Sequence, residues 1–506
     1  MKVMLLEHPR TISAEHCNDI ANTPLSSCLL TGYAAGMLRG EGYEVEIVEG
    51  YLEDLSYDDI AARIRSTRPD LLALHLVYQW RIDHALFDLL ARLKEEGLWK
   101  HLTAYGFYPT FAYEELLIRC RWVDSVVVGE PELTLAGLAR AIARVSAAGR
   151  CEDTGDVLGL ALRKESGGVG YCYRPLAGDL DSLPFPVRTE ASFRLPQVNL
   201  QGSRGCYGRC TFCYVNPFYG PGSKWRERSP ENIIAEIDRI ISEREARHFY
   251  FVDPNFFGPG EQGRKRTLHL AALLKPRNIR FGIEGRVNDI REETIAALVE
   301  AGLTHILIGL ESGSDLALKR MQKMTSVAQN ERAIGVLRRH GLEPNIGFIM
   351  FEPYSSLADI ENNLVFLQRN GLLQDLAITS NVLYHHQIIL KGTPCYQELL
   401  RQGCLDVDGF SAYEARTTFA DPKVATLAGI MRRITNHIFQ RMADAFSCRC
   451  QEPAGSPGKN GRLNGMLLNW FTSLLHDLET QQFGPEMAED FVGETIAEID
   501  RVLGEG

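Results

Sequence analysis

The sequence predicts an α/β protein of 506 residues built in successive parts. Strand and helix signals alternate over residues 1–148, which is typical of a doubly wound parallel sheet. Six strand–helix units follow within residues 191–400 and predict a partial (βα)6 barrel. Only helical spacing is found after that point, so residues 401–506 are predicted to form a mainly helical region. Residues 149–190 contain glycines, prolines and acidic residues, and we predict a connector there.

The first part is predicted to be a flavodoxin-like or Rossmann-type domain. Its expected strands are 3–6, 44–48, 71–75, 101–105 and 124–130, and its expected helices are 29–41, 58–66, 84–95 and a last one ending near 147. Each strand is a short apolar run, and each helix has apolar residues on one face. Ligands of such sheets bind at the carboxyl ends of the strands, where the strand order reverses.

The predicted barrel follows the same logic. Its expected strands are 197–200, 248–252, 280–286, 305–311, 345–351 and 376–384, with helices between them such as 229–243 and 327–340. Barrels of this kind place their site at the carboxyl ends of the strands. We therefore expect the functional residues of this part to follow its strands directly.

Composition and charge restrict the class of protein. The formal net charge of −11 argues against a nucleic-acid binder, which requires a basic face for phosphate contacts. No apolar run of about 18 residues is present, so no membrane span is predicted. The apolar start is too short for a signal peptide, and the 12 cysteines lack the spacing of a disulfide framework. These features predict a cytoplasmic protein.

Three cysteines form a compact motif after the first barrel strand. Cys206, Cys210 and Cys213 have the spacing Cys-x3-Cys-x2-Cys. Three thiolates on one loop suit an iron–sulfur cluster, and a missing fourth ligand would leave one iron open. The alternative is structural zinc, which favours two cysteine pairs or a cysteine pair with a histidine pair. Such a partner pair is not found close by in the sequence.

With the aromatic Phe212 before its third cysteine, this loop resembles the signature of the radical S-adenosylmethionine (radical SAM) superfamily. The resemblance implies a 4Fe–4S cluster whose open iron binds SAM. It also implies that the reduced cluster cleaves SAM to methionine and a 5′-deoxyadenosyl radical.

Further segments are similar to the SAM-binding phrases of this superfamily. They are 251–256 (FVDPNF), 284–286 (EGR) and 309–314 (GLESGS). The resemblance implies that SAM contacts Phe212, Asp253, Asn255, Glu284, Arg286, Glu311 and Ser312. SAM carries charges of both signs, so carboxylates and a cation are expected around it. The alternative is a barrel interior in which these buried charges pair with one another.

The first part resembles the cobalamin-binding domain found in front of many radical SAM enzymes. The similar segments are 23–27 (TPLSS), 105–110 (YGFYPT) and 129–132 (GEPE), and the loop 77–80 (VYQW) is the one that would face the cobalt. The residues implied to contact cobalamin are Pro24, Leu25, Tyr78, Gln79, Trp80, Gly106, Phe107, Tyr108, Pro109, Gly129 and Glu130. The Asp-x-His-x-x-Gly motif that ligates cobalt in other cobalamin proteins is absent from the sequence. The alternative is a domain of this fold that binds another ligand or none.

Two residue pairs remain as candidates outside these motifs. His385 and His386 follow the sixth predicted strand and are candidate substrate contacts, although such a pair is also compatible with a structural role. Cys448 and Cys450 form a Cys-x-Cys pair in a Gly/Pro-rich loop, where a metal site and two bystander thiols are both possible. The helical tail is expected to cover the open side of the barrel.

Together, these resemblances imply a cobalamin-dependent radical SAM enzyme, and a C-methyltransferase in particular. One SAM would methylate cobalamin, a second would yield the 5′-deoxyadenosyl radical, and an unactivated carbon of a small molecule would receive the methyl group from methylcobalamin. The alternatives are a non-methylating relative that oxidises, cyclises or rearranges its substrate, and a cofactor-binding protein without turnover. The expected partners are a small-molecule substrate and an electron donor such as flavodoxin or ferredoxin.

Overall fold

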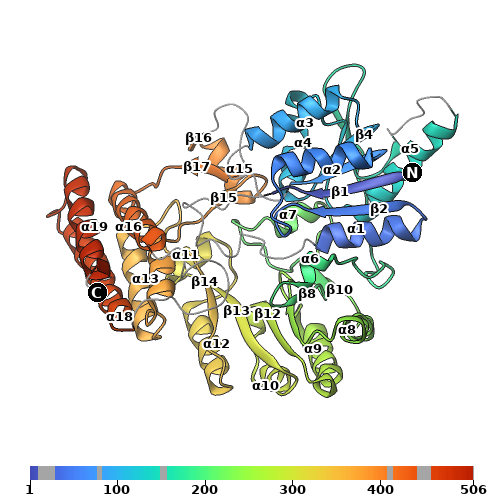
Figure 1. Cartoon of the computed structure of the whole chain (residues 1–506). Coiled ribbons are helices and arrows are strands. Elements are labelled where there is room, and N and C mark those ends of the chain that lie inside the picture. The colour runs from blue at the N-terminus through green and yellow to red at the C-terminus, as the bar shows by residue number, and fades with distance from the viewer. Residues whose placement is uncertain (10–28, 77–82, 149–155, 407–413, 442–456, 505–506) are drawn as a thin grey trace.

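The structure is a computed structural model that describes residues 1–9, 29–76, 83–148, 156–406, 414–441 and 457–504. Figure 1 shows the N-terminal domain in blue, the barrel in green to orange beside it, and the C-terminal helices in red on the far side of the barrel. The predicted order of the parts is therefore confirmed.

The N-terminal domain is a seven-stranded sheet in the order β2-β1-β3-β4-β5-β6-β7. Its first five strands pair in parallel: β1 (Lys2–Glu7), β2 (Glu44–Glu49), β3 (Leu71–His75), β4 (His101–Tyr105) and β5 (Ser125–Val127). The helices are α1 (Leu29–Gly40), α2 (Tyr57–Thr67), α3 (His84–Glu95), α4 (Phe107–Arg119) and α5 (Glu132–Ala148). Every predicted strand is present, and α4 is an additional helix. The order reverses beside β1, as in doubly wound sheets.

The predicted connector 149–190 needs a correction. It contains β6 (Leu160–Arg163) and β7 (Val169–Tyr171), an antiparallel hairpin that extends the sheet from β5. Gly167 and Gly168 form its turn with φ of 90° and 79°. Two glycines between short apolar runs are a hairpin signal, so these glycines mark a turn inside the first domain and do not mark its boundary.

The barrel sheet has the order β14-β13-β12-β11-β8, and all its pairs are parallel. Its strands are β8 (Val198–Leu200), β11 (His248–Phe251), β12 (Arg280–Arg286), β13 (Leu303–Glu311) and β14 (Asn345–Phe348). The helices around it are α8 (Pro230–Arg244), α9 (Gly260–Leu274), α10 (Glu292–Glu300), α11 (Asp315–Arg320), α12 (Val327–Arg339) and α13 (Leu357–Arg369).

The sixth predicted strand, 376–384, is instead helix α14 (Leu376–Tyr384). Asp375 caps it by accepting hydrogen bonds from the amides of Ala377 and Ile378. A short apolar run does not distinguish a strand from a buried helix, and this cap decides in favour of the helix. A single parallel bridge between Phe351 and His386 lies after this helix, at the sixth position of the barrel.

The C-terminal region is mainly helical, as predicted, with α16 (Pro422–Arg441), α18 (Pro457–Glu479) and α19 (Ala488–Gly504). Its apolar residues share one core with the barrel, and the ring of Phe351 lies 6.2 Å from that of Phe419 and 6.4 Å from that of Phe471. The shorter elements are α6 (Glu190–Phe193), β9 (Ser203–Arg204), α7 (Val215–Tyr219), β10 (Arg226–Glu227), β15 (Ile389–Leu390), α15 (Pro394–Arg401), β16 (Leu405–Asp406) and β17 (Glu414–Thr417). Among the described residues, we find no helix with the length and apolarity that a membrane crossing requires.

Candidate functional site

The three cysteines of the motif line one cavity of about 540 Å³ at the carboxyl ends of the barrel strands. Their loop leaves the barrel through β9 and returns through β10, and these two strands pair with each other. Cys210 is buried, whereas Cys206 and Cys213 are half-buried. The loop therefore presents three thiols to one cavity.

The surroundings of the thiols fit a bound metal cluster. Burial raises the pKa of Cys206, and it raises the pKa of Cys213 to about 12. Such thiols stay protonated by themselves and ionise when a metal or a cation is close. The guanidinium Nη1 of Arg286 lies 3.3 Å from the Cys210 sulfur. Across the described residues, no group of three or more His, Cys, Asp and Glu side chains is arranged to hold a single ion; in a four-iron cluster each thiolate binds a different iron.

Five charged side chains line the rest of the cavity: Arg209, Glu284, Arg286, Glu311 and Lys323. The Lys323 ammonium lies 2.5 Å from Glu311 Oε1 and 6.0 Å from the centre of the Phe212 ring. Arg286 donates to the carbonyl of Lys323, and its buried Nε has no hydrogen-bond partner in the described part of the chain. Positive and negative side chains therefore line the same cavity, and the buried Nε of Arg286 beside it lacks a hydrogen-bond partner among the described residues.

Glu284 lies at the same cavity and accepts a hydrogen bond of 3.0 Å from the hydroxyl of Tyr250. Burial raises the pKa of Glu284 to about 7, because the hydrogen bond from Tyr250 only partly offsets desolvation and the negative charge of Asp253 adds to it. A cationic ligand beside this carboxyl would favour its ionised form.

Bare backbone forms part of the cavity wall. Gly309 of β13 and Gly347 of β14 are paired in register, and both line the cavity. A Cβ atom at Gly309 would lie 2.4 Å from Glu311 Oε1 and 2.6 Å from Lys323 Nζ. A side chain here would displace the ion pair, so the glycine keeps open a cradle for a ligand. This cradle and the mixed charges around it fit SAM.

Sequence reasoning did not identify every residue of the cavity. Lys323, Gly309, Gly347 and Pro394 line it and were not predicted as site residues. Lys323 belongs to a loop that follows α11, beyond the recognisable GLESGS phrase, so its position in the chain gave no signal. Glycines opposite each other on two strands can be found only when the register is known.

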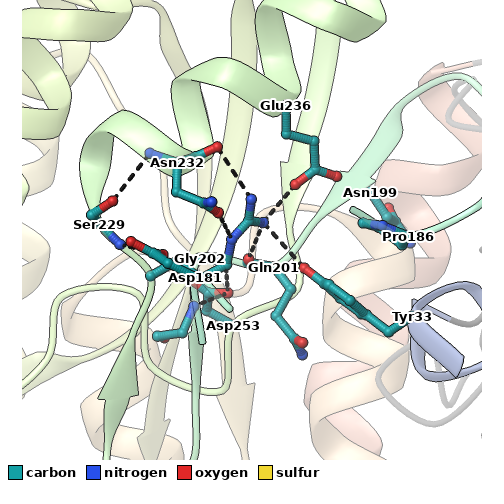
Figure 2. Close-up of polar contacts among 12 residues, drawn as sticks. Tyr33, Asp181, Pro186, Asn199, Gln201, Gly202, Ser229, Asn232, Glu236 and Asp253 are labelled. Atoms are coloured by element: carbon teal, nitrogen blue, oxygen red, sulfur yellow. Dashed lines mark hydrogen bonds and ion pairs between the residues drawn. The ribbon is translucent and has the colours of Figure 1, made fainter. Parts of the chain in front are cut away.

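Three predicted SAM contacts lie beside the cavity but not on its surface. Asp253 accepts hydrogen bonds from the amides of Gly202 (2.6 Å) and Ser203 (3.0 Å), and Figure 2 shows it next to Gly202. Burial raises the pKa of Asp253 to about 6, against the opposing charge of Arg266. These bonds hold the strand that leads into the cysteine loop.

The other two are Asn255 and Ser312. Asn255 donates to Asp289 (3.1 Å), while its buried Oδ1 has no hydrogen-bond partner among the described residues. Ser312 donates to Asn363 (2.7 Å). Direct SAM contacts of Asp253, Asn255 and Ser312 stay predictions.

The histidine pair lies away from the cavity lining. The His386 Nε2 is 3.8 Å from Glu414 Oε1, and the carbonyl of His385 accepts from the amides of Met350 and Phe351. Neither histidine lines the cavity. A substrate contact for this pair stays a prediction.

Part of the predicted cobalamin site lies outside the described residues: Pro24, Leu25, Tyr78, Gln79 and Trp80. The same holds for the pair Cys448 and Cys450. The remaining residues follow two strands of the N-terminal sheet. Gly106, Phe107, Tyr108 and Pro109 come after β4, and Gly129 and Glu130 come after β5.

Among the described residues that were predicted to contact cobalamin, only Glu130 carries a charged side chain, and two of the others are glycines. Gly106 and Gly129 have φ of 112° and 83°, and a Cβ atom at Gly106 would lie 2.7 Å from the His75 ring. Such an edge fits a bulky ligand lying across the strand ends. Tyr108 is fully buried in the core of the domain, and burial raises its pKa. Glu130 is paired with Arg204 and Arg226.

Comparison with known proteins agrees with this geometry. A sequence model of the radical SAM superfamily matches residues 200–367, and a model of the B12-binding domain matches residues 31–139. A protein named as an uncharacterized methyltransferase of Pyrococcus horikoshii is 27% identical over 378 residues, which are 73% of this chain and 78% of that protein. The anaerobic magnesium-protoporphyrin IX monomethyl ester cyclase of Cereibacter sphaeroides is 25% identical over 433 residues, 80% of this chain and 65% of the cyclase.

A solved structure shares the fold over the whole chain. It is the cobalamin-dependent S-adenosylmethionine radical enzyme OxsB with aqua-cobalamin and S-adenosylmethionine bound. The TM-score is 0.70 at 19% identity, with 100% of this chain and 84% of that chain covered. The likeness confirms the predicted fold class.

Proposed function

We propose that this chain, which belongs to the radical SAM superfamily and carries an N-terminal B12-binding domain, transfers a methyl group to an unactivated carbon of a small molecule. The two domain matches confirm the expected cofactors, a 4Fe–4S cluster, SAM and cobalamin. The methyl transfer and the class of substrate are the proposed part.

The observation that supports a SAM-cleaving site is the cavity itself. Three cysteines, two carboxylates and three cations line one space of about 540 Å³, with Gly309 and Gly347 in its wall. SAM has a carboxylate, an ammonium and a sulfonium, so it requires partners of both signs. Arg286 and Lys323 suit the carboxylate, whereas Glu284 and Glu311 suit the cationic groups.

When bound, the cluster and SAM supply the 5′-deoxyadenosyl radical, and the cobalamin supplies the methyl group. The chain's own residues bind and orient these groups. Cys206, Cys210 and Cys213 hold the cluster at the carboxyl ends of the strands. The ring of Phe212 packs against the apolar side chains of α11 and narrows the cavity next to the cysteines.

The relatives support methyl transfer and also favour a second candidate. The relative from Pyrococcus horikoshii is named a methyltransferase, whereas the relative from Cereibacter sphaeroides is named a cyclase. A non-methylating enzyme with the same cofactors is therefore the second candidate. Both candidate functions require an external electron donor of the flavodoxin or ferredoxin type.

An anaerobic incubation of the reconstituted protein with cobalamin, a chemical reductant and methyl-labelled SAM tests the proposal. We expect labelled methylcobalamin together with S-adenosylhomocysteine and 5′-deoxyadenosine, measured by mass spectrometry. Formation of 5′-deoxyadenosine with bound but unlabelled cobalamin would favour the second candidate. Absence of both SAM products would contradict both candidates.

A further inference from the structure

We propose that Glu130 and Glu132 of the B12-binding domain clamp the cysteine loop through Arg204 and Arg226, and so position the cobalamin site against the cluster. The inference rests on the proposed function, because it requires that both domains hold their cofactors. Glu130 and Glu132 act as positioning residues, not as catalytic ones.

The clamp acts on the base of the cysteine loop. Arg204 lies in β9, two residues before Cys206, and Arg226 is its register partner in β10. The two strands bracket the loop that carries all three cysteines. A shift of this strand pair would therefore also move the three cysteines of the loop.

The charges in the clamp are closely paired and buried. Arg204 Nη1 lies 2.8 Å from Glu130 Oε1, and its Nη2 lies 2.6 Å from Glu132 Oε1. Arg226 reaches both oxygens of Glu130, at 2.8 and 3.1 Å. Arg204 is only 1% exposed, and its guanidinium lies 4.9 Å from the ring centre of Tyr33 in α1. Removal of a partner from such a pair leaves a buried charge uncompensated.

The other flank of the cysteine loop contacts the same domain. Tyr214 follows Cys213 directly, and its ring lies 4.8 Å from that of Phe107. The ring of Phe218 in α7 lies 4.6 Å from the ring of Phe107. The loop is thus held on both sides by the segments that follow β4 and β5.

These two segments also form the edge at which the B12-binding domain is expected to hold its ligand. Glu130 was predicted to contact cobalamin, but its carboxylate is used by the two arginines. One contact surface therefore serves both the ligand edge of the first domain and the base of the cluster loop. A misplacement of reacting groups by about 1 Å costs on the order of a hundredfold in rate, so a fixed relation between the two sites is required.

The chain contains a matched control. Glu236 of α8 also binds two arginines, Arg188 at 2.6 Å and Arg228 at 2.5 Å, and its side chain is 1% exposed against 9% for Glu130. Arg228 also donates to the Tyr33 hydroxyl of α1 (3.1 Å) and to the Gln201 carbonyl (2.9 Å), so this control is read only at the segments after β4 and β5. Glu236→Gln removes the same kind of ion pair as Glu130→Gln and leaves the four side chains of the clamp unchanged.

The first measurement needs no cofactor. Hydrogen–deuterium exchange of the cofactor-free protein follows the amides of residues 203–205 and 226–228 and those of the segments after β4 and β5. In Glu130→Gln we expect the amides of the strand pair and those of the segments after β4 and β5 to exchange about tenfold to a hundredfold faster. This factor corresponds to the loss of one hydrogen bond to a charged group. In Glu236→Gln the segments after β4 and β5 should exchange as in the unsubstituted protein.

The second measurement uses the reconstituted protein with cob(II)alamin and the reduced cluster. Pulsed electron paramagnetic resonance reports the magnetic interaction between the two centres. We expect Glu130→Gln to retain its iron and cobalamin and to lose part of this interaction, with a broader distance distribution, while Glu236→Gln keeps the distribution of the unsubstituted protein.

The outcomes separate the inference from the proposed function. An unchanged distance distribution in Glu130→Gln would overturn the clamp and leave the enzyme assignment standing. Failure of the unsubstituted protein to bind cobalamin would overturn the proposed function, and the clamp with it. If Glu130→Gln does not fold, Glu132→Gln removes one partner of Arg204 and leaves the Arg226–Glu130 pair, and the same two results decide the question.

Discussion

Two buried arginines of the barrel, Arg228 and Arg286, differ in whether their hydrogen bonds are complete. Around Arg228, every guanidinium nitrogen has a protein partner, including the Glu236 carboxylate at 2.5 Å and the Tyr33 hydroxyl at 3.1 Å. Figure 2 shows these partners closing around one point between α8 and the first domain. Around Arg286, the Nε atom has no hydrogen-bond partner in the described chain, and the group faces a cavity.

The difference shows how a binding site is told apart from a structural ion-pair network. Burial and charge are common to both groups, so neither property identifies the site. An unsatisfied donor is not sufficient either, because the buried Nε of Arg188 beside Glu236 also has no hydrogen-bond partner among the described residues. The Arg286 group is set apart by the three cysteines that line the same cavity. The four predictions below test this comparison, from the largest expected effect to the smallest.

Cys206→Ala should abolish SAM cleavage. Loss of one thiolate removes a ligand that the cluster needs. Without the cluster, no reductant for SAM is left in the cavity. Bound iron and 5′-deoxyadenosine are the quantities to measure. Cys404→Ser, at an exposed thiol, is the control and should retain both. Full iron content in Cys206→Ala would show that this loop does not hold the cluster.

Glu236→Ala should lower the free energy of unfolding by about 3–5 kcal/mol, because Arg188 and Arg228 would remain buried without their carboxylate. Urea unfolding followed by circular dichroism measures this value. Glu243→Ala on the same helix removes only an exposed pair with Arg239, worth about 0.3–0.5 kcal/mol. Equal losses in the two variants would mean that the Arg228 network contributes no more than a surface ion pair.

Lys323→Met should weaken SAM binding about tenfold to a hundredfold, the value of one hydrogen bond to a charged group. Equilibrium dialysis of labelled SAM against the reconstituted protein measures the Kd. The exposed Lys319→Met, one turn earlier, is the control. An unchanged Kd would show that Lys323 does not bind SAM and is a structural charge, like those around Arg228.

Glu284 should give the cavity a pH dependence. The pKa of its carboxyl is about 7, so the ionised fraction rises about tenfold from pH 6 to pH 8. If the carboxylate binds the cationic part of SAM, kcat/KM for 5′-deoxyadenosine formation rises with pH over this interval and is flat in Glu284→Gln. The exposed Glu293→Gln should keep the rise. A rise that persists in Glu284→Gln would assign the titration to another group.

The sequence predicted the fold well where a pattern is local. Each parallel strand of both sheets was identified by a short apolar run between turn signals, and the cysteine loop by its spacing. The errors at 160–171 and 376–384 have one cause. A hairpin and a short buried helix are each decided by one or two residues, here Gly167 with Gly168 and Asp375, and apolar runs alone do not reveal them.

The site was predictable only as far as its motifs reach. Phe212, Glu284, Arg286 and Glu311, four of the predicted SAM contacts, line the cavity, and their contact with SAM stays a prediction. Lys323 and the pairing of Gly309 with Gly347 depend on tertiary contacts, which no linear pattern records. Asp253 shows the opposite case, since its motif is recognisable although its Oδ1 accepts from two backbone amides, while its buried Oδ2 has no hydrogen-bond partner among the described residues.

The facing glycines of β13 and β14 also limit how this chain can change over generations. Every amino-acid replacement of a glycine adds a side chain, so a substitution at Gly309 or Gly347 can only reduce the space beside this wall. A Cβ atom at Gly309 would lie within 2.6 Å of Glu311 and Lys323. Substitutions at other lining residues, for example Gln322 or Pro394, change the cavity and leave this wall as it is.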